Sequence, residues 1–112
     1  MHDFAAHIRD IPDFPKPGIV FKDLTPVMRD ARLLRAAAAA LAAPFVTDRV
    51  DLVLGMEARG FIFGSLVAAE LDAGFVPLRK PGKLPYLTHQ VTHDLEYGSA
   101  ALEMHQDAVG PG

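Results

Sequence analysis

The residues best suited to chemistry lie in two short loops, and both loops suit an anionic ligand. The first, Glu57-Ala58-Arg59-Gly60, follows an apolar run typical of a buried strand and precedes a helical segment. Backbone N–H groups and the helix dipole at such a junction attract anions, and the Arg59 guanidinium adds a fork suited to phosphate oxygens. The simpler interpretation is a glycine-rich connection in which Arg59 pairs with Glu57. Spacing alone leaves both interpretations open.

The second loop, Arg79-Lys80-Pro81-Gly82-Lys83, carries three cations within five residues. It follows another apolar run, so parallel strands would bring it to the same sheet edge as Arg59. A cluster of this kind can hold an anion the size of pyrophosphate. A run of charges is usually a solvated loop, but two cationic loops at one edge favour binding.

Glu96 and Phe21 are further candidates, whereas one pair of histidines is not. Glu96, followed by Tyr97 in an expected hairpin turn, suits a proton carrier on a lid, although turn acids are usually only solvated. Phe21, next to exposed strand backbone, suits stacking on a planar heterocycle, although such a ring is more often core. His89 and His93 are four residues apart in an expected strand, and no metal site is assigned to them.

The elements that must position these residues predict an α/β fold. Residues 50–54 and 75–78 have the pattern of buried strands, with a helix predicted over 61–71 between them. This order is a βαβ unit, which implies a parallel sheet. Residues 87–95 and 100–104 predict a β-hairpin.

The N-terminal part is predicted to be more irregular. A short helix is expected at 4–9, then an extended, rigid, proline-rich loop at 12–18, and a β-type triplet at 19–21. The alanine-rich segment 31–43 is the strongest helix signal, with Asp30 as its N-cap and Pro44 as its stop.

The amino-acid composition argues against several classes of function. With 11 Lys plus Arg against 14 Asp plus Glu, the 112-residue chain has a formal charge of −3, which argues against a nucleic-acid partner. It contains no cysteine, so disulfides and thiolate chemistry are excluded. The start lacks a signal-peptide pattern, and the longest apolar stretch, 33–46, is broken by Arg35 and Pro44 and is too short for a membrane span. We therefore expect a cytoplasmic protein with no membrane partner.

Several segments, taken together in this order, resemble the adenine phosphoribosyltransferase family. The resemblance covers nearly the whole chain from Ile8 onward, and its motifs are specific because they occur in register. The segments are residues 11–26 (IPDFPKPGIVFKDLTP), 57–64 (EARGFIFG), 79–85 (RKPGKLP), 95–98 (LEYG) and 102–108 (LEMHQDA).

This resemblance implies transfer of ribose 5-phosphate from phosphoribosyl pyrophosphate to adenine, giving AMP and pyrophosphate, with Mg²⁺ as cofactor and a homodimer as assembly. It implies a partial type I phosphoribosyltransferase fold: a parallel sheet flanked by helices plus a β-hairpin flap. Residues 1–112 would form a single incomplete domain, divided into a base-binding segment (1–30), a βαβ core (31–78) and a flap hairpin (79–105).

The resemblance also implies roles for individual residues. The Val20 backbone would read the adenine edge, Phe21 would stack on its ring, Glu96 would carry the proton and Tyr97 would lie on the flap. Lys22 stands where the family commonly has arginine, and lysine lacks the fork of a bidentate contact. The pyrophosphate would be contacted by residues of the two cationic loops, partly from the neighbouring subunit: Glu57, Ala58, Arg59, Gly60, Arg79, Lys80 and Lys83.

One part of the family pattern lies outside these 112 residues. It consists of C-terminal strands, two acids that contact the ribose hydroxyls and an Ala-Thr-Gly-Gly-Thr loop that binds the 5′-phosphate. We therefore expect a truncated or fragmentary chain that is inactive and poorly folded by itself.

Three alternatives remain open. The first is a regulatory domain that senses phosphoribosyl pyrophosphate, which the acidic charge disfavours. The second is a phosphoribosyltransferase for another purine such as xanthine. The third is a remnant that serves only as a dimerisation partner.

Overall fold

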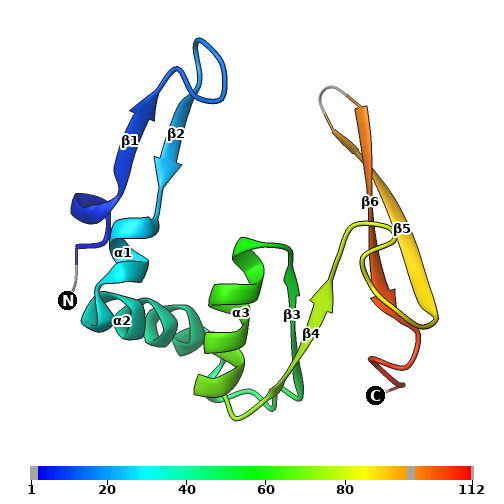
Figure 1. Ribbon diagram of the computed structural model, residues 1–112. Helices are drawn as coiled ribbons and strands as arrows, with labels where there is room; N and C mark the ends of the chain where they lie inside the picture. Colours follow the sequence, from blue (N-terminus) through cyan, green and yellow to red (C-terminus); the bar gives the residue numbers. More distant parts are fainter. Residues whose placement is uncertain (1–2, 96–97, 112) are drawn as a thin grey trace. The chain divides into compact units, whose positions relative to one another are not determined.

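The computed structural model describes residues 3–95 and 98–111. The chain divides into two compact units, residues 1–44 and residues 45–112. Each unit is built from its own short elements, which Figure 1 labels. Over the described ranges, no helix has the length and apolar character needed to cross a membrane.

The first unit consists of an antiparallel strand pair followed by two helices (Figure 1). In the strand pair, Ile11 stands opposite Phe21 and Pro12 opposite Val20. The elements in chain order are the 3-10 turn η1 (Ala5–His7), β1 (Arg9–Pro12), β2 (Val20–Asp23), α1 (Thr25–Arg29) and α2 (Ala31–Ala42).

Two predictions for the N-terminal residues are wrong. The helix expected at 4–9 is only the three-residue turn η1, because the chain becomes extended at Ile8 and Arg9 begins β1. The loop at 12–18 is not extended but turns back between the strands. Its turn is closed by two bonds: the Gly18 N–H donates to Asp13 Oδ1 at 3.0 Å, and the Phe14 N–H donates to the Ile19 carbonyl at 3.1 Å. Gly18 adopts a φ of +89°, which glycine tolerates.

Helix α2 begins where the sequence predicts. The Asp30 carboxylate accepts hydrogen bonds from the N–H groups of Arg32 and Leu33, at 2.9 and 3.2 Å, so Asp30 is the N-cap. The helix ends at Ala42, and Pro44 lies in the 3-10 turn η2 (Ala43–Phe45) that follows. The buried side chains of this unit are Val27 of α1 and Leu33, Ala38 and Ala42 of α2.

The second unit contains the predicted βαβ unit, and the prediction is confirmed. Strands β3 (Leu52–Met56) and β4 (Gly74–Leu78) are parallel, and helix α3 (Arg59–Glu70) connects them and packs on the pair (Figure 1). In the register of this pair, Met56 stands opposite Leu78, so both strands end side by side.

The predicted hairpin is also confirmed, as β5 (Thr88–Leu95) paired antiparallel with β6 (Gly98–His105). An isolated antiparallel bridge between Arg79 and Glu103 connects the residue after β4 to the hairpin. The chain between β4 and β5 is thereby held against β6 at its start.

Close packing between α3 and the strands depends on glycine. A Cβ built on Gly55 would lie 2.6 Å from Cε1 of Phe75 and would also collide with the Gly60 carbonyl. A Cβ on Gly64 would lie 2.8 Å from the same ring atom. Phe75 fills this space and meets Phe61 edge to face, with ring centroids 5.9 Å apart. The backbone of the loop 57–60 is therefore pressed against β3.

Candidate functional site

The loop of residues 57–60 connects β3 to α3 and includes the first two residues of that helix. The Glu57 N–H donates to the Leu78 carbonyl at 3.0 Å, which extends the parallel pairing by one bond beyond Met56. The Phe61 N–H donates to the Ala58 carbonyl at 3.1 Å and closes the first turn. The N-cap residue of this twelve-residue helix is Ala58, whose side chain has no atom that can accept a capping hydrogen bond. The arrangement is that of a strand end meeting a helix N-terminus, where backbone N–H groups and the dipole favour anions.

Glu57 links this loop to the basic loop, which we define as residues 79–83. Glu57 Oε1 accepts hydrogen bonds from the Lys80 N–H at 2.8 Å and from Arg79 Nε at 3.2 Å. The bond from the Lys80 N–H is the main cause that lowers the pKa of Glu57; desolvation opposes it, and the Arg79 guanidinium assists it. Glu57 is therefore ionised at neutral pH. Its ion pair is with Arg79, whereas the simpler sequence interpretation paired it with Arg59.

Arg79 is held on several sides. Its Nε contacts Glu57, and its Cζ lies 5.8 Å from the centroid of the Phe61 ring. Its main chain exchanges two hydrogen bonds with Glu103, at 2.9 and 2.6 Å. The side chain is about one-third exposed (35%). Nε is one of five N–H donors on a guanidinium, so the pair with Glu57 uses only part of its donor capacity.

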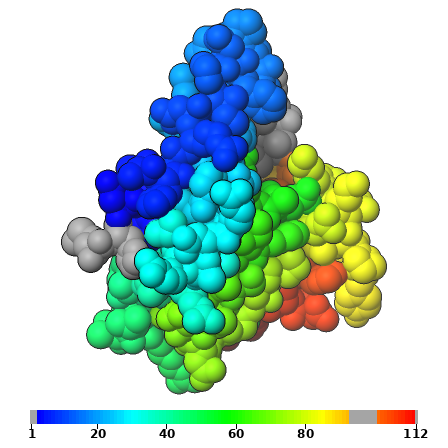
Figure 2. Space-filling view, turned by 60° about the vertical axis from the view of Figure 1, so that its left-hand side comes forward, coloured from blue at the N-terminus to red at the C-terminus, as the bar shows by residue number. Residues whose placement is uncertain are grey.

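The basic loop turns sharply at Pro81 and Gly82. The Lys83 N–H donates to the Lys80 carbonyl at 3.2 Å, and Gly82 has a φ of +82°. Proline followed by a glycine with positive φ is the pattern of a type II turn. Lys80 and Lys83 are both exposed, and the segment that contains them, yellow in Figure 2, lies at the surface.

The proposed base-binding residues lie on β2, in the first unit. Val20 is 53% exposed, and the residue opposite it, Pro12, has no N–H to donate to the Val20 carbonyl. Phe21 is half-buried and meets Phe14 edge to face, with centroids 5.3 Å apart. β2 thus carries an exposed residue, Val20, beside an aromatic ring.

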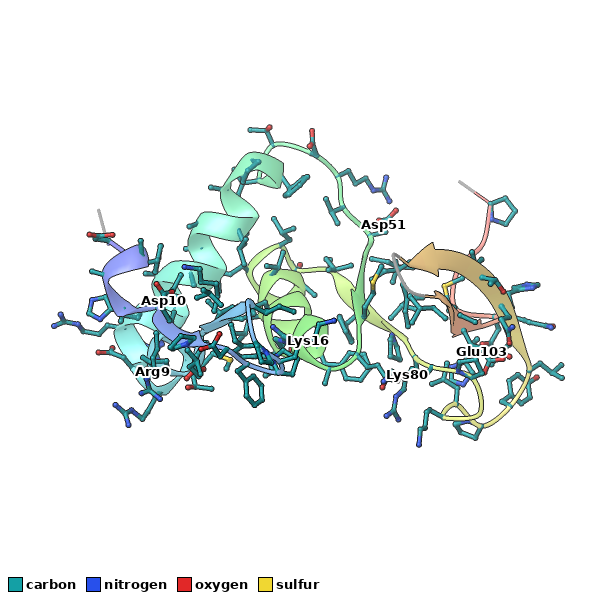
Figure 3. The ribbon with its side chains drawn as sticks, turned by 90° about the horizontal axis from the view of Figure 1, so that it is seen from above. Arg9, Asp10, Lys16, Asp51, Lys80 and Glu103 are labelled. Carbon is teal, nitrogen blue, oxygen red and sulfur yellow. The ribbon has the colours of Figure 1, made fainter. Side chains whose placement is uncertain are left out.

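Lys22 already has an acidic partner. Its Nζ lies 2.7 Å from Asp10 Oδ1, across the β1–β2 pair. Arg9 and Asp23 form a second ion pair across the same strands, at 3.2 Å. Arg9 and Asp10 are labelled in Figure 3. Sequence reasoning missed both pairs because it did not predict β1.

The structure brings Glu57, Arg79 and Lys80 into direct contact, and it places Arg59 at the first position of α3. The predicted proton carrier Glu96 and its neighbour Tyr97 lie outside the described residues. In the portions of the chain that are described, no group of three or more His, Asp or Glu side chains is placed to hold a metal ion.

Sequence reasoning also missed Glu103, which lies on β6 next to the basic loop (Figure 3). Its Oε1 accepts the Gly82 N–H at 3.0 Å and its Oε2 accepts the Thr88 hydroxyl at 3.1 Å. Two positions further on, His105 Nε2 lies 2.6 Å from the Pro85 carbonyl. The sequence signal for Glu103 is an acidic residue between apolar residues of a predicted strand, and this signal is weak.

An apolar groove of about 400 Å³ also lies in the second unit. Its lining is almost wholly apolar, so it does not suit a phosphate group. The lining residues are Leu54, Met56, Leu78, His89, Val91, Leu102, Glu103 and Met104.

Comparison with known proteins identifies the family. No protein-family model matches the chain. The adenine phosphoribosyltransferase of Methylococcus capsulatus is 61% identical over 112 residues, which are 100% of this chain and 66% of that protein. The crystal structure of adenine phosphoribosyltransferase from Rhodothermus marinus superposes with a TM-score of 0.89 at 53% identity, covering 97% of this chain and 62% of that one. The Giardia lamblia enzyme, complexed with 9-deazaadenine, gives 0.89 at 41% identity, covering 97% and 61%.

The fold is thus an α/β, partial type I phosphoribosyltransferase fold, as predicted. The chain belongs to the adenine phosphoribosyltransferase family. It spans about two-thirds of the length of the Methylococcus capsulatus relative.

Proposed function

We propose that the protein is an adenine phosphoribosyltransferase of purine salvage, which transfers ribose 5-phosphate from phosphoribosyl pyrophosphate to adenine and releases pyrophosphate. The observation that carries the proposal is the pairing of two cationic loops at one sheet edge. Met56 and Leu78 stand opposite each other at the ends of parallel strands, and the loop with Arg59 and the basic loop follow them directly. Ligands of open α/β sheets bind at this edge.

The pyrophosphate group is proposed to bind to these loops. Arg59, Arg79, Lys80 and Lys83 supply positive charge, and the loop 57–60 supplies backbone N–H groups. As the glycosidic bond breaks, negative charge grows on the leaving pyrophosphate. Fixed cations stabilise that charge more strongly than they stabilise the ground state, and this difference accelerates the step.

Adenine is proposed to bind at β2. The exposed Val20 backbone can offer hydrogen bonds to the edge of the base, and Phe21 can stack on its ring. Lys22, which is paired with Asp10, would contact the same base. The 9-deazaadenine held by the Giardia lamblia enzyme supports adenine as the base. Glu96 is proposed to carry the proton that adenine loses, with Tyr97 beside it on the flap.

Mg²⁺ is proposed to enter with phosphoribosyl pyrophosphate. The described side chains do not form a site for it, since no three ligating groups converge. Mg²⁺ commonly keeps several waters and binds through substrate phosphates.

The assembly and domain organisation complete the proposal. Residues 1–112 would belong to a single phosphoribosyltransferase domain with the segments 1–30, 31–78 and 79–105, working as a cytoplasmic homodimer. Some cations of the basic loop would then contact the pyrophosphate bound to the neighbouring subunit.

Calorimetric titration with pyrophosphate tests the anion site directly. A Lys80→Ala, Lys83→Ala double variant should lose most of the affinity, and the affinity of the unmodified chain should fall as salt rises. Arg35→Ala, an exposed cation of α2 in the first unit, is the matched control and should bind as the unmodified chain does. Equal affinities in all three proteins would refute the proposed site.

A further inference from the structure

We infer that Glu103 is a positioning residue that holds the basic loop in its anion-binding conformation. The inference rests on the proposed function, because it concerns the pyrophosphate site of that same function. Glu103 contacts Arg79, Gly82 and Thr88, so it acts through the loop and not on the reacting atoms.

Glu103 contacts the basic loop at two points, Arg79 and Gly82. Its main chain pairs with Arg79, where the loop begins, through two hydrogen bonds of 2.9 and 2.6 Å. Its Oε1 accepts the Gly82 N–H at 3.0 Å, at the tip of the turn. One residue therefore fixes the start of the loop and the peptide group between Pro81 and Gly82.

The carboxylate itself is oriented by a second bond. Thr88, the first residue of β5, donates its hydroxyl to Glu103 Oε2 at 3.1 Å, and both side chains are half-buried. Hydrogen bonds to an ionised carboxylate are shorter and stronger than neutral ones. The turn is thus tied to the hairpin through a carboxylate that has little freedom to rotate.

His105, the last residue of β6, and Gln106 after it hold the segment that follows the turn. The Gln106 N–H donates to the Leu87 carbonyl at 2.9 Å, and Gln106 Nε2 donates to the Thr88 carbonyl at 3.0 Å. His105 Nε2 lies 2.6 Å from the Pro85 carbonyl. These contacts fasten the chain after the turn, whereas Glu103 contacts the turn itself at Gly82.

Glu57 holds the opposite side of the same loop. It accepts the Lys80 N–H and Arg79 Nε, while Glu103 accepts the Gly82 N–H. Two carboxylates thus accept the N–H groups on either side of Pro81 in a loop that carries three cations. An acid placed beside an anion site lowers its positive potential, so its presence requires a compensating benefit. A loop that is already ordered loses less conformational entropy when the anion binds.

The sign of an affinity change separates positioning from simple electrostatics. Glu103→Gln keeps a carbonyl for the Gly82 N–H, and its amide can donate to the Thr88 hydroxyl. Glu103→Met keeps the length of the side chain but has no oxygen acceptor. Both remove one negative charge, so electrostatics alone predicts tighter pyrophosphate binding in both. Positioning predicts that the Met variant binds more weakly and that the Gln variant does not.

The test uses two measurements on the 112-residue chain. Amide hydrogen exchange at Gly82 should be about tenfold faster in Glu103→Met than in the unmodified chain, and close to the unmodified rate in Glu103→Gln. The dissociation constant for inorganic pyrophosphate should rise about tenfold in the Met variant only. Glu70→Gln, an exposed acid at the end of α3, controls for net charge and should change neither quantity by more than about twofold.

The outcomes are distinct. Unchanged Gly82 exchange in Glu103→Met, or tighter pyrophosphate binding in both Glu103 variants, overturns the inference. If the Met variant does not fold, Glu103→Ala takes its place with the same expected results. If the unmodified chain binds no pyrophosphate while Gly82 exchange still responds to the Met variant and not to the Gln variant, Glu103 does position the loop and the proposed anion site is what fails.

Discussion

Replacement of Gly55 by alanine tests how the loop 57–60 is held against its strand. The new Cβ would lie 2.6 Å from Cε1 and 2.7 Å from Cζ of Phe75 and would collide with the carbonyl of Gly60. The ring could move by changing its rotamer. The carbonyl is main chain, so it can move only if the whole loop shifts.

The size of the effect follows from these two collisions. Forcing an extra carbon into a packed interior typically costs about 1–3 kcal/mol. A collision with main chain as well as a ring places Gly55→Ala at the upper end, about 3 kcal/mol. This corresponds to a change of roughly 150-fold in the folding equilibrium and to a fall of about 10–20 °C in Tm for a chain of this length. Because the loop must shift, the affinity for pyrophosphate should fall as well.

Urea and thermal unfolding, followed by circular dichroism, measure the change; a cooperative transition in the unmodified 112-residue chain would also contradict the expectation that this chain is poorly folded by itself. Gly110→Ala is the matched control, since nothing lies within 4 Å of the position that its Cβ would take. It should change the free energy of unfolding by no more than about 0.5 kcal/mol. A loss below about 1 kcal/mol in Gly55→Ala would refute the reasoning, because it would mean that the loop is not pressed against β3.

Three further predictions concern single contacts. Gly64→Ala should destabilise through the Phe75 ring alone, so adding Phe75→Leu should recover part of the loss in a double-mutant cycle; strict additivity would contradict this. The pKa of Glu57 is lower in the folded chain than its ordinary value of 4.5, so ionised Glu57 stabilises the fold at pH values above 4.5. This stabilisation is lost as the pH falls from 4.5 through the pKa of the folded state, so the free energy of unfolding should fall over that range, and by less in Glu57→Gln. Parallel pH curves for the two proteins would count against the pairing. Leu33→Ala should cost about 2–4 kcal/mol in chemical denaturation because Leu33 is buried, and a cost under 1 kcal/mol would place it outside the core.

Local signals predicted the fold where a single segment determines its own structure. Asp30 caps α2 because its carboxylate reaches N–H groups two and three residues ahead. The βαβ unit followed from two apolar runs separated by a helical one. The N-terminal strand β1 was missed because Arg9–Pro12 has no strand pattern and becomes a strand only by pairing with β2, across a turn closed by the Asp13 side chain.

The candidate site was predictable in outline and not in its contacts. Sheet logic placed two cationic loops at one edge, and β3 and β4 do end side by side. The pairing of Glu57 with Arg79, 22 residues away, depends on strand register, which no local pattern encodes. Arg59, two residues from Glu57 in sequence, looked the nearer partner. The 21-residue contact from Glu103 to Gly82 is of the same kind.

The two acids beside the basic loop explain how three cations can sit together before any anion arrives. Arg79, Lys80 and Lys83 repel one another, and without partners the loop would spread into solvent. Glu57 accepts hydrogen bonds from the Lys80 N–H and from Arg79 Nε, and Glu103 accepts one from the Gly82 N–H. These bonds keep the loop folded while both lysines remain exposed. Both acids are only partly exposed, so salt screens their repulsion of an incoming anion only in part. The order that Glu103 gives to the loop must therefore outweigh that repulsion, and Glu103→Met should weaken pyrophosphate binding at low and at physiological salt alike.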